Sequence, residues 1–306
     1  YNGATTIEMQ AFDGTSTLVA TTTLDGAQTI ATSNTHAAIV KAINSAAGAQ
    51  TISGQFLTEV QATINGAGAQ TIGNALGGGS HLINVTATVL GAGDQTITTT
   101  STSNATVNAT CTTGTQRIVT GVGNDSVIAH STTASNNVIT TDAGNDTIIA
   151  GQGNDSITGG LGSDSMTGGG GTDTFVFGAN GSIVGASMDI ITDFNNADAD
   201  ILTFGGNTTV LAADASVLVA GTNVQTSAGG LITFDISDNT LAFKIAAVEA
   251  DAQLDVAGSV AMFVDSGNTY LYYAGIAAGN LDDQVIQLTG ITTFITITGG
   301  PTTTII

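Results

Sequence analysis

Polar and apolar residues alternate in short runs along this chain, and glycine-containing turns separate the runs. One unit, Gly-x-Gln-Thr-Ile, recurs at intervals of 20 to 25 residues, with Arg in place of Thr in its last copy. The copies begin at Gly26, Gly48, Gly68, Gly93 and Gly114. The glycine allows a turn, the next residues enter a strand, and this repeat length is typical of one solenoid coil. The pattern predicts an all-β fold, a parallel β-solenoid, over residues from about 20 to 176.

A second period, of nine residues, begins in the middle of the chain. Glycines precede an aspartate, which a small hydroxyl residue and then an apolar residue follow. The aspartates are Asp125, Asp146, Asp155, Asp164 and Asp173, and the last four are nine residues apart. A flexible glycine-rich linker would not keep this register. Each unit therefore predicts a turn and a short strand, so that two units make one coil, with Asp146 over Asp164 and Asp155 over Asp173.

The nine-residue unit offers the ligands that calcium prefers. Calcium takes six to eight oxygen ligands from carboxylates and backbone carbonyls, and glycine lets the backbone turn sharply around an ion. The motif resembles the RTX calcium-binding nonapeptide repeat, and this resemblance implies ions between successive turns of a β-roll. The candidate metal ligands are Asp125, Gly144, Asp146, Gly151, Gly153, Asp155, Gly160, Gly162, Asp164, Gly169, Gly171 and Asp173. Ca²⁺ is the expected cofactor.

The distribution of charge fits paired metal ligands. The chain has 3 Lys+Arg and 24 Asp+Glu, a net charge of −21. Ten of the acids lie between Asp125 and Asp200, where a divalent cation would relieve their repulsion. So few basic residues argue against nucleic acid as a partner. The single cysteine, Cys111, permits no internal disulfide, and no apolar stretch has the length of a membrane span.

Three features of the coils leave alternatives open. The apolar residues of segments 39–43 and 57–64 also fit helical spacing, so either segment is a strand or a short helix. The stretch 129–140 breaks the nine-residue period, and we expect an irregular coil there, with Asn136 or Asn137 as a substitute ligand. Asp94 stands where other copies of the longer unit have alanine, so its coil is interpreted as intermediate between the two types.

The C-terminal segment differs in pattern. Residues 189–202 resemble the segment that closes the solenoid in RTX proteins, and the resemblance implies Asp193 as a further metal ligand, although Ala197 and Thr203 depart from the family pattern. Ser237 or Asp238 is expected to cap one helix, with Leu241, Ile245, Val248 and Ala252 along one face. Strands 260–264 and 269–273 predict a hairpin about Ser266-Gly267-Asn268. The strand 283–290 is similar to one near the end of bacterial S-layer proteins and other RTX exports, which implies type I secretion.

These observations predict three domains. They are calcium-poor coils (1–119), an RTX β-roll (120–177), and a β-rich cap and secretion domain with one helix (178–306). Catalytic residues are expected to be absent, because His36, His81 and His130 lie far apart and no Gly-x-Ser-x-Gly motif occurs.

The expected function is that of an extracellular calcium-binding protein that assembles with itself into a surface layer or matrix fibre. A cell-surface polysaccharide is a further candidate partner. The alternatives are a calcium-dependent adhesin, an ice-binding module with threonine ladders such as 96–100, or the non-catalytic RTX part of a secreted enzyme.

Overall fold

The computed structural model describes most of the chain in two compact units. The described residues are 5–9, 16–22, 25–32, 38–54, 57–74, 83–99, 102–131, 133–178, 181–182, 187–195, 198–204, 209–210, 225–226, 231–234, 240–251, 254, 256–275, 283–291, 297–298 and 303–305. The first unit consists of residues 1–157 and 169–171, and the second of residues 158–168 and 172–306. This division follows packing, whereas the predicted limits at residues 119 and 177 follow motif chemistry, so those limits stay a prediction.

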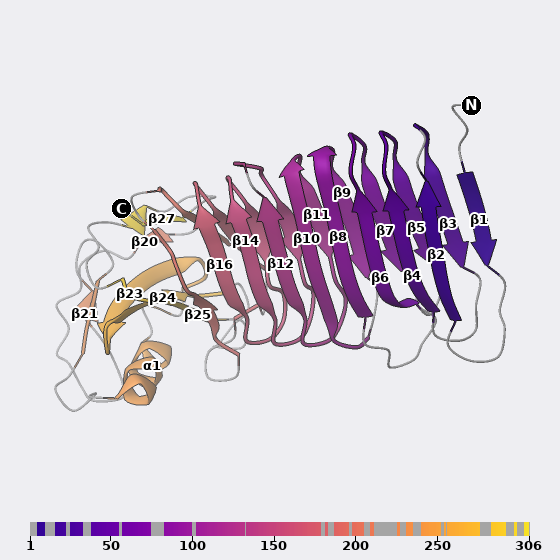
Figure 1. The fold of residues 1–306 in the computed structure, drawn as a ribbon. Helices are drawn as coiled ribbons and strands as arrows, with labels where there is room; N and C mark the ends of the chain where they lie inside the picture. The colour runs from indigo at the N-terminus through magenta and orange to yellow at the C-terminus, as the bar shows by residue number, and fades with distance from the viewer. Residues whose placement is uncertain are drawn as a thin grey trace. The chain divides into compact units, whose positions relative to one another are not determined.

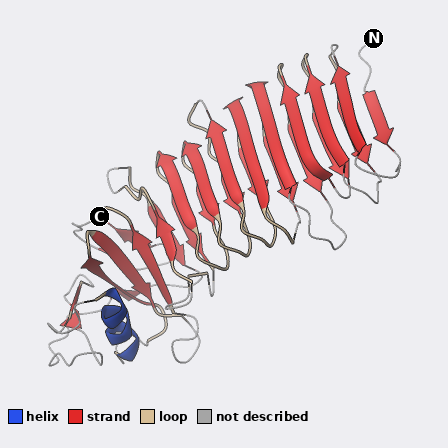
Figure 2. Cartoon of the chain, turned by 60° about the horizontal axis from the view of Figure 1, so that its bottom comes forward, coloured by secondary structure: helices blue, strands red, loops and turns tan. Residues whose placement is uncertain are grey.

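The first unit is a parallel β-solenoid built of two sheets, and successive strands of the chain alternate between them (Figures 1 and 2). Sheet A contains β1 (Thr5–Met9), β3 (Gln28–Thr32), β5 (Gln50–Gly54), β7 (Gln70–Asn74), β9 (Gln95–Thr99), β11 (Gln116–Val119), β13 (Val138–Thr140) and β15 (Ser156–Thr158). Sheet B contains β2 (Ser16–Thr22), β4 (Ala38–Asn44), β6 (Leu57–Ile64), β8 (Ile83–Ala92), β10 (Ala105–Thr113), β12 (Ser126–Ser131) and β14 (Thr147–Gln152). The predicted fold class is confirmed.

Alternation of side chains along each strand builds the interior of this solenoid. In sheet A the isoleucine of every repeat points inward, and the parallel register stacks it on the isoleucine of the next coil. The stacked residues are Ile30, Ile52, Ile72, Ile97, Ile118 and Ile139, and all are fully buried. Segments 39–43 and 57–64 lie in β4 and β6, so the helical alternative for them is wrong. Pairing with parallel neighbours on both sides satisfies their backbone, which spacing alone does not reveal.

A second interior column is polar. Gln28, Gln50, Gln70, Gln95 and Gln116 begin successive strands of sheet A and point inward, each at most 1% exposed. From Gln50 onward, each glutamine donates from Nε2 to Oε1 of the glutamine one coil earlier, at 2.6, 2.8, 3.0 and 2.5 Å along the column. A buried amide left without partners costs about 1–3 kcal/mol, so neighbouring coils satisfy one another. We call this position the A column.

The second unit contains both parallel and antiparallel strand pairs. One sheet contains β17 (Thr174–Phe177), β19 (Ile201–Phe204), β27 (Thr303–Ile305) and β26 (Ile297–Thr298). The other contains β16 (Ser165–Gly170), β18 (Asp189–Ile191), β25 (Gln284–Leu288), β24 (Asn268–Tyr273), β23 (Ser259–Asp265) and β20 (Thr209–Val210). A short pair is formed by β21 (Gln225–Thr226) and β22 (Ile232–Thr233). From β25 onward the pairing with β24 and β23 is antiparallel.

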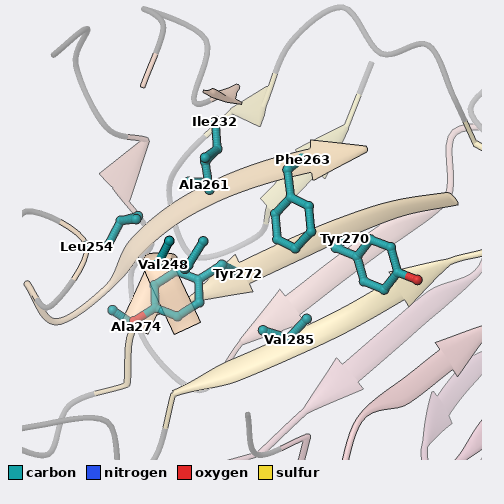
Figure 3. Close-up of a cluster of buried hydrophobic side chains, with 10 residues drawn as sticks. Ile232, Val248, Leu254, Ala261, Phe263, Tyr270, Tyr272, Ala274 and Val285 are labelled. Atoms are coloured by element: carbon teal, nitrogen blue, oxygen red, sulfur yellow. The ribbon is translucent and has the colours of Figure 1, made fainter. Parts of the chain in front are cut away.

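The sheet of β23, β24 and β25 is buried on both faces. One face packs with the helix α1 (Leu241–Ala250) in a cluster that contains Val248, Phe263 and Tyr272 (Figure 3). On the other face Tyr273 stacks on Phe204, with ring centroids 4.4 Å apart. The predicted hairpin is confirmed, and its two-residue turn places both Ser266 and Gly267 at positive φ.

The single described helix is present but begins later than predicted. Thr240, not Ser237 or Asp238, is its N-cap, and the Thr240 side chain accepts from Phe243 N at 3.3 Å. Ser237, Asp238 and Ala252 lie outside the described residues. The predicted face is confirmed where it is described, because Leu241, Ile245 and Val248 pack in the cluster.

Candidate metal centre

Aspartates form a buried column along the edge where each sheet B strand begins, which we call the B column. In the first unit Asp125 Oδ1 accepts from Ala105 N at 2.7 Å, and Asp146 Oδ1 accepts from Asp125 N at 2.6 Å. In the second unit Asp189 Oδ1 accepts from Asp164 N at 2.8 Å. One oxygen of each carboxylate therefore holds the backbone of the preceding coil.

The A column changes from amides to carboxylates along the chain. In the first unit Asn137 Oδ1 accepts from Gln116 N at 3.0 Å, and Asp155 Oδ1 accepts from Asn137 N at 2.6 Å. In the second unit Asp200 Oδ1 accepts from Asp173 N at 2.9 Å. In both columns, therefore, a side-chain oxygen of the column residue accepts a hydrogen bond from a backbone N–H of the coil before it.

These carboxylates are taken out of water. Asp125, Asp146, Asp155, Asp164, Asp173, Asp189 and Asp200 are each only 1 to 3% exposed. Burial raises the pKa of Asp155 to about 6, although hydrogen bonds from Asn137 oppose the shift. Burial also raises the pKa values of Asp125 and Asp200. A row of desolvated anions is unfavourable without positive charge beside it, and a divalent cation supplies that charge.

The glycines of the repeats keep space and backbone geometry that no other residue allows. Gly144, Gly151, Gly153, Gly160, Gly162, Gly169 and Gly171 all have φ between +107° and +143°. A Cβ on Gly144 would lie 1.9 Å from the carbonyl oxygen of Gly123. A Cβ on Gly159 would lie 2.2 Å from Asp164 Oδ2, and one on Gly168 would lie 2.2 Å from Asp173 Oδ2. Glycine therefore lets these carboxylate oxygens lie close to the backbone, where any other residue would place its Cβ.

The residues present fit calcium. Asp125 Oδ2 is buried and has no hydrogen-bond partner within the described part of the chain, so an acceptor oxygen points into the interior without a donor. Among the described residues no three His, Cys, Asp or Glu side chains gather at one point. A column spaces its carboxylates one coil apart, so a calcium site here would draw its other ligands from turn carbonyls, as calcium permits.

The structure places the predicted site residues in two groups. Asp125, Asp146 and Asp155 lie in the columns of the first unit, with Asp164 and Asp173 in those of the second. The expected stacking of Asp146 over Asp164 and of Asp155 over Asp173 joins the two units and stays a prediction. Asp193 is only partly buried and accepts from Gly168 N at 3.0 Å, so it lies beside a repeat but outside both columns.

Two column members were absent from the predicted ligands. Asp189 and Asp200 occupy the same position as the repeat aspartates, although no glycine motif precedes them. Both stand directly before two apolar residues that enter a strand. In the sequence, such a column residue can be recognised as an aspartate directly before two apolar residues.

A third set of contacts joins the turns outside the columns. Asn104 Oδ1 accepts from Asn124 N at 2.8 Å, and Asn124 Oδ1 accepts from Asn145 N at 2.9 Å. On the other edge Asn136 Oδ1 accepts from Asn154 N at 3.0 Å. The sequence carries this signal as Gly-Asn-Asp in three repeats. These asparagines fix one turn on the next, so their role is structural.

The column positions also decide two open interpretations. Of the two candidate substitutes, Asn137 occupies the A column and Asn136 lies in the exposed turn. Asp94 is not a column residue, because Gln95 fills that place; Asp94 is exposed and accepts from Thr115 N at 2.8 Å. Its coil is therefore of the glutamine type, and the intermediate interpretation is wrong.

The fold and the columns define a parallel β-solenoid whose turns offer carboxylate and carbonyl oxygens to a cation. A family model described as the RTX calcium-binding nonapeptide repeat matches four copies in this chain, over residues 131–166 and 140–175. The chain therefore contains RTX nonapeptide repeats, which are known calcium-binding motifs. No curated protein matches the chain in a sequence comparison.

Of the three histidines, His130 is exposed on the outer face of β12. His36 and His81 lie outside the described residues. No helix within the described ranges combines the length and the apolar character of a membrane span.

Proposed function

We propose that this protein is a secreted, non-catalytic structural protein, which calcium first folds and then assembles with further copies into an extracellular layer or fibre. The observation that supports this most is the burial of the carboxylate columns. Because the coils carry desolvated anions, the folded state requires a cation, and the ion becomes a trigger. Calcium is scarce in cytosol and abundant outside cells, so folding follows export.

Association between copies is supported by the outer faces of the solenoid. Among the described side chains on the strands of the first unit, Arg117 is the charge on the outer face of sheet A, and Lys41 and Glu59 are those on sheet B. The other described acidic side chains of this unit lie in columns and turns. Calcium bound there would lower the net charge of −21 and reduce repulsion between approaching copies.

Calcium titration with light scattering and negative-stain imaging tests assembly. Scattering is expected to rise with calcium and with protein concentration, and arrays or filaments are expected in the images. Magnesium is the matched control, because it gives up its waters reluctantly and suits large flexible sites poorly. A protein that remains monomeric in millimolar calcium at high concentration would exclude assembly.

Export is proposed to use a C-terminal signal that includes β25. The support is the presence of RTX repeats together with the strand 283–290. Deletion from Asp282 onward is expected to leave the protein inside the producing cell. Gly144→Ala is the control, because it disturbs the folded coil and leaves the C-terminal segment intact. Secretion of the truncated protein at the normal level would refute the proposal.

A second candidate function rests on one row of threonines. Thr6, Thr29, Thr51, Thr71 and Thr96 stack in register on the outer face of sheet A. Their regular hydroxyl and methyl groups favour binding to an ordered water surface, namely ice, although threonine is also common on outer strand faces. Thermal hysteresis that Thr71→Lys removes and Thr63→Lys on sheet B preserves would support this function over assembly. Absence of hysteresis would exclude it.

A further inference from the structure

The coils before the nonapeptides contain no column of carboxylates. Their interior is nevertheless connected by hydrogen bonds to the carboxylates of the coils that follow. The glutamine part of the A column runs from Gln28 to Gln116, with every amide oriented in the same direction. Within the described residues, Gln28 Nε2 and Gln116 Oε1, at its two ends, are buried without hydrogen-bond partners. No glutamine between them can satisfy its amide within its own coil. Each such coil therefore gains its hydrogen bonds only when a neighbouring coil is already in place.

Asn137 joins this glutamine column to the carboxylates. Its Oδ1 accepts from Gln116 N, and its own N donates to Asp155 Oδ1 at 2.6 Å. Its Nδ2 donates to Ala150 O at 3.0 Å, so the side chain also reaches the strand that leads to the Asp155 turn. Asn137 is fully buried. It is the described residue whose hydrogen bonds reach both parts of the column.

The two parts differ in what they need to fold. The glutamine part is neutral and satisfied by amide contacts, but its last member depends on Asn137 for the partner of its backbone N–H. The carboxylate part holds desolvated anions and requires a cation. Once an ion fixes Asp155, that carboxylate fixes Asn137, and Asn137 presents an ordered edge to Gln116. Order can then pass coil by coil toward Gln28.

We propose that calcium controls the folding of coils that do not bind it: Asn137 couples the ion-bound coils to the glutamine coils, so that residues 26–119 become ordered only after the nonapeptides do. This rests on the proposed calcium-dependent folding. It makes calcium a switch for the whole first unit, including the outer threonine and sheet B faces.

Hydrogen exchange of the full chain, followed by mass spectrometry during calcium titration, tests the coupling. In the parent protein, amides of β5, β7 and β9 are expected to gain protection at the same calcium midpoint as amides of β12 and β14. Asn137→Leu removes both side-chain hydrogen bonds and keeps a similar volume. It is expected to lower protection of β7 and β9 about tenfold or more, with β14 still protected by calcium.

Two further variants keep the test decisive. Asn136→Ala changes the exposed neighbour, whose Oδ1 accepts from Asn154 N, and is expected to leave the coupling intact. Gln95→Leu breaks the amide chain between Gln70 and Gln116, and is expected to lower protection of β5 and β7 without changing the calcium midpoint of β14. If Asn137→Leu prevents folding altogether, the outcome of Gln95→Leu alone decides whether the coupling exists.

The possible failures are distinct. If β5, β7 and β9 are already protected in chelator while β12 and β14 respond to calcium, the coupling is refuted and the calcium-folded repeats stand. If no segment responds to calcium, the proposed function itself fails. Unchanged protection of β5 and β7 in both Asn137→Leu and Gln95→Leu would also refute the coupling.

Discussion

The glutamine coils of residues 26–119 have the same backbone plan as the aspartate coils that follow them. The two types differ in the buried residue at the A column. In the first type, a glutamine begins the sheet A strand and bonds to the glutamine of the coil before. In the second, an aspartate precedes the strand and bonds to a backbone amide. The amide brings a donor and an acceptor, so the stack satisfies itself. The carboxylate brings acceptors and charge, so its stack needs a cation.

The comparison teaches that one solenoid can hold an interior that binds no ion and an interior that needs one, by exchanging one functional group. The change occurs at Asn137, which has the amide of the first type and the backbone contacts of the second. Glycine content follows the same division. The turns before Asp155, Asp164 and Asp173 each carry two positive-φ glycines, whereas the glutamine-type turns have one described positive-φ glycine or none.

Removal of calcium is the largest perturbation of this comparison. Thorough chelation is expected to abolish the β signal in circular dichroism, and millimolar calcium is expected to restore it. The reason is that buried carboxylates without a cation oppose the folded state. An unchanged spectrum after chelation would mean that the two types of coil do not differ in their need for an ion.

Introducing a carboxylate into the glutamine part of the A column should destabilise the coils around it nearly as much as removal of calcium does. Gln70→Glu removes the donor to Gln50 Oε1 and buries a charge, so we expect a loss of about 3–5 kcal/mol in the free energy of unfolding at neutral pH. Denaturant unfolding in saturating calcium measures it. Thr71→Glu, on the outer face of the same strand, is the control, with an expected change of about 0.5 kcal/mol. Equal effects would contradict the role given to the column.

Gly144→Ala tests the backbone of the aspartate coils. The residue has φ +143°, and an added Cβ would lie 1.9 Å from Gly123 O, so we expect a loss of about 2–3 kcal/mol in the free energy of unfolding. Gly73→Ala in β7 is the control, because no atom lies within 4 Å of the added Cβ. The control should be neutral or stabilise the strand by about 0.5–1 kcal/mol. Thermal unfolding in calcium distinguishes the two variants.

Loss of a column carboxylate should weaken calcium binding more than it changes the fold in saturating ion. Asp155→Ala and Asp164→Ala are expected to reduce calcium affinity about tenfold or more, because each removes a charged oxygen ligand. Asp25→Ala is the control, since Asp25 is exposed and only accepts from a backbone amide in the turn, Ala47 N at 3.2 Å. Calorimetric titration gives the affinities. A similar loss in all three variants would mean that the acids act only through net charge.

The pH dependence is expected to be the smallest effect. Burial raises the pKa of Asp155 to about 6, so the folded, calcium-free protein binds a proton there that the unfolded chain has released. Its stability without calcium should therefore fall as pH rises through about 6. Calcium must displace that proton, so its apparent affinity should fall as the pH drops below about 6. Calcium titrations on the two sides of this pH test it, and Asp155→Asn should reduce the dependence.

Much of the site was accessible from the sequence because its chemistry is periodic. The glycine-aspartate motif identifies five column aspartates, four of them nine residues apart, and every predicted ligand glycine proves to have positive φ. Asp189 and Asp200 were harder to assign, because they belong to the columns through strand register rather than through a motif. The N-cap at Thr240 was missed for a similar reason, since several capping residues precede that helix and packing of α1 selects among them.

The sequence by itself determined the class of fold, the repeat length, the calcium motif and the strong negative charge, because each is a local or periodic property of residue types. Tertiary structure decided which polar residues are inside. Gln95 and Asp94 are neighbouring polar residues, yet only Gln95 enters the column, because strand alternation turns one side chain inward and leaves the other in the turn. The continuity from Gln116 through Asn137 to Asp155 likewise exists only in the stacked coils, where residues about 20 positions apart in sequence share one hydrogen-bonded column.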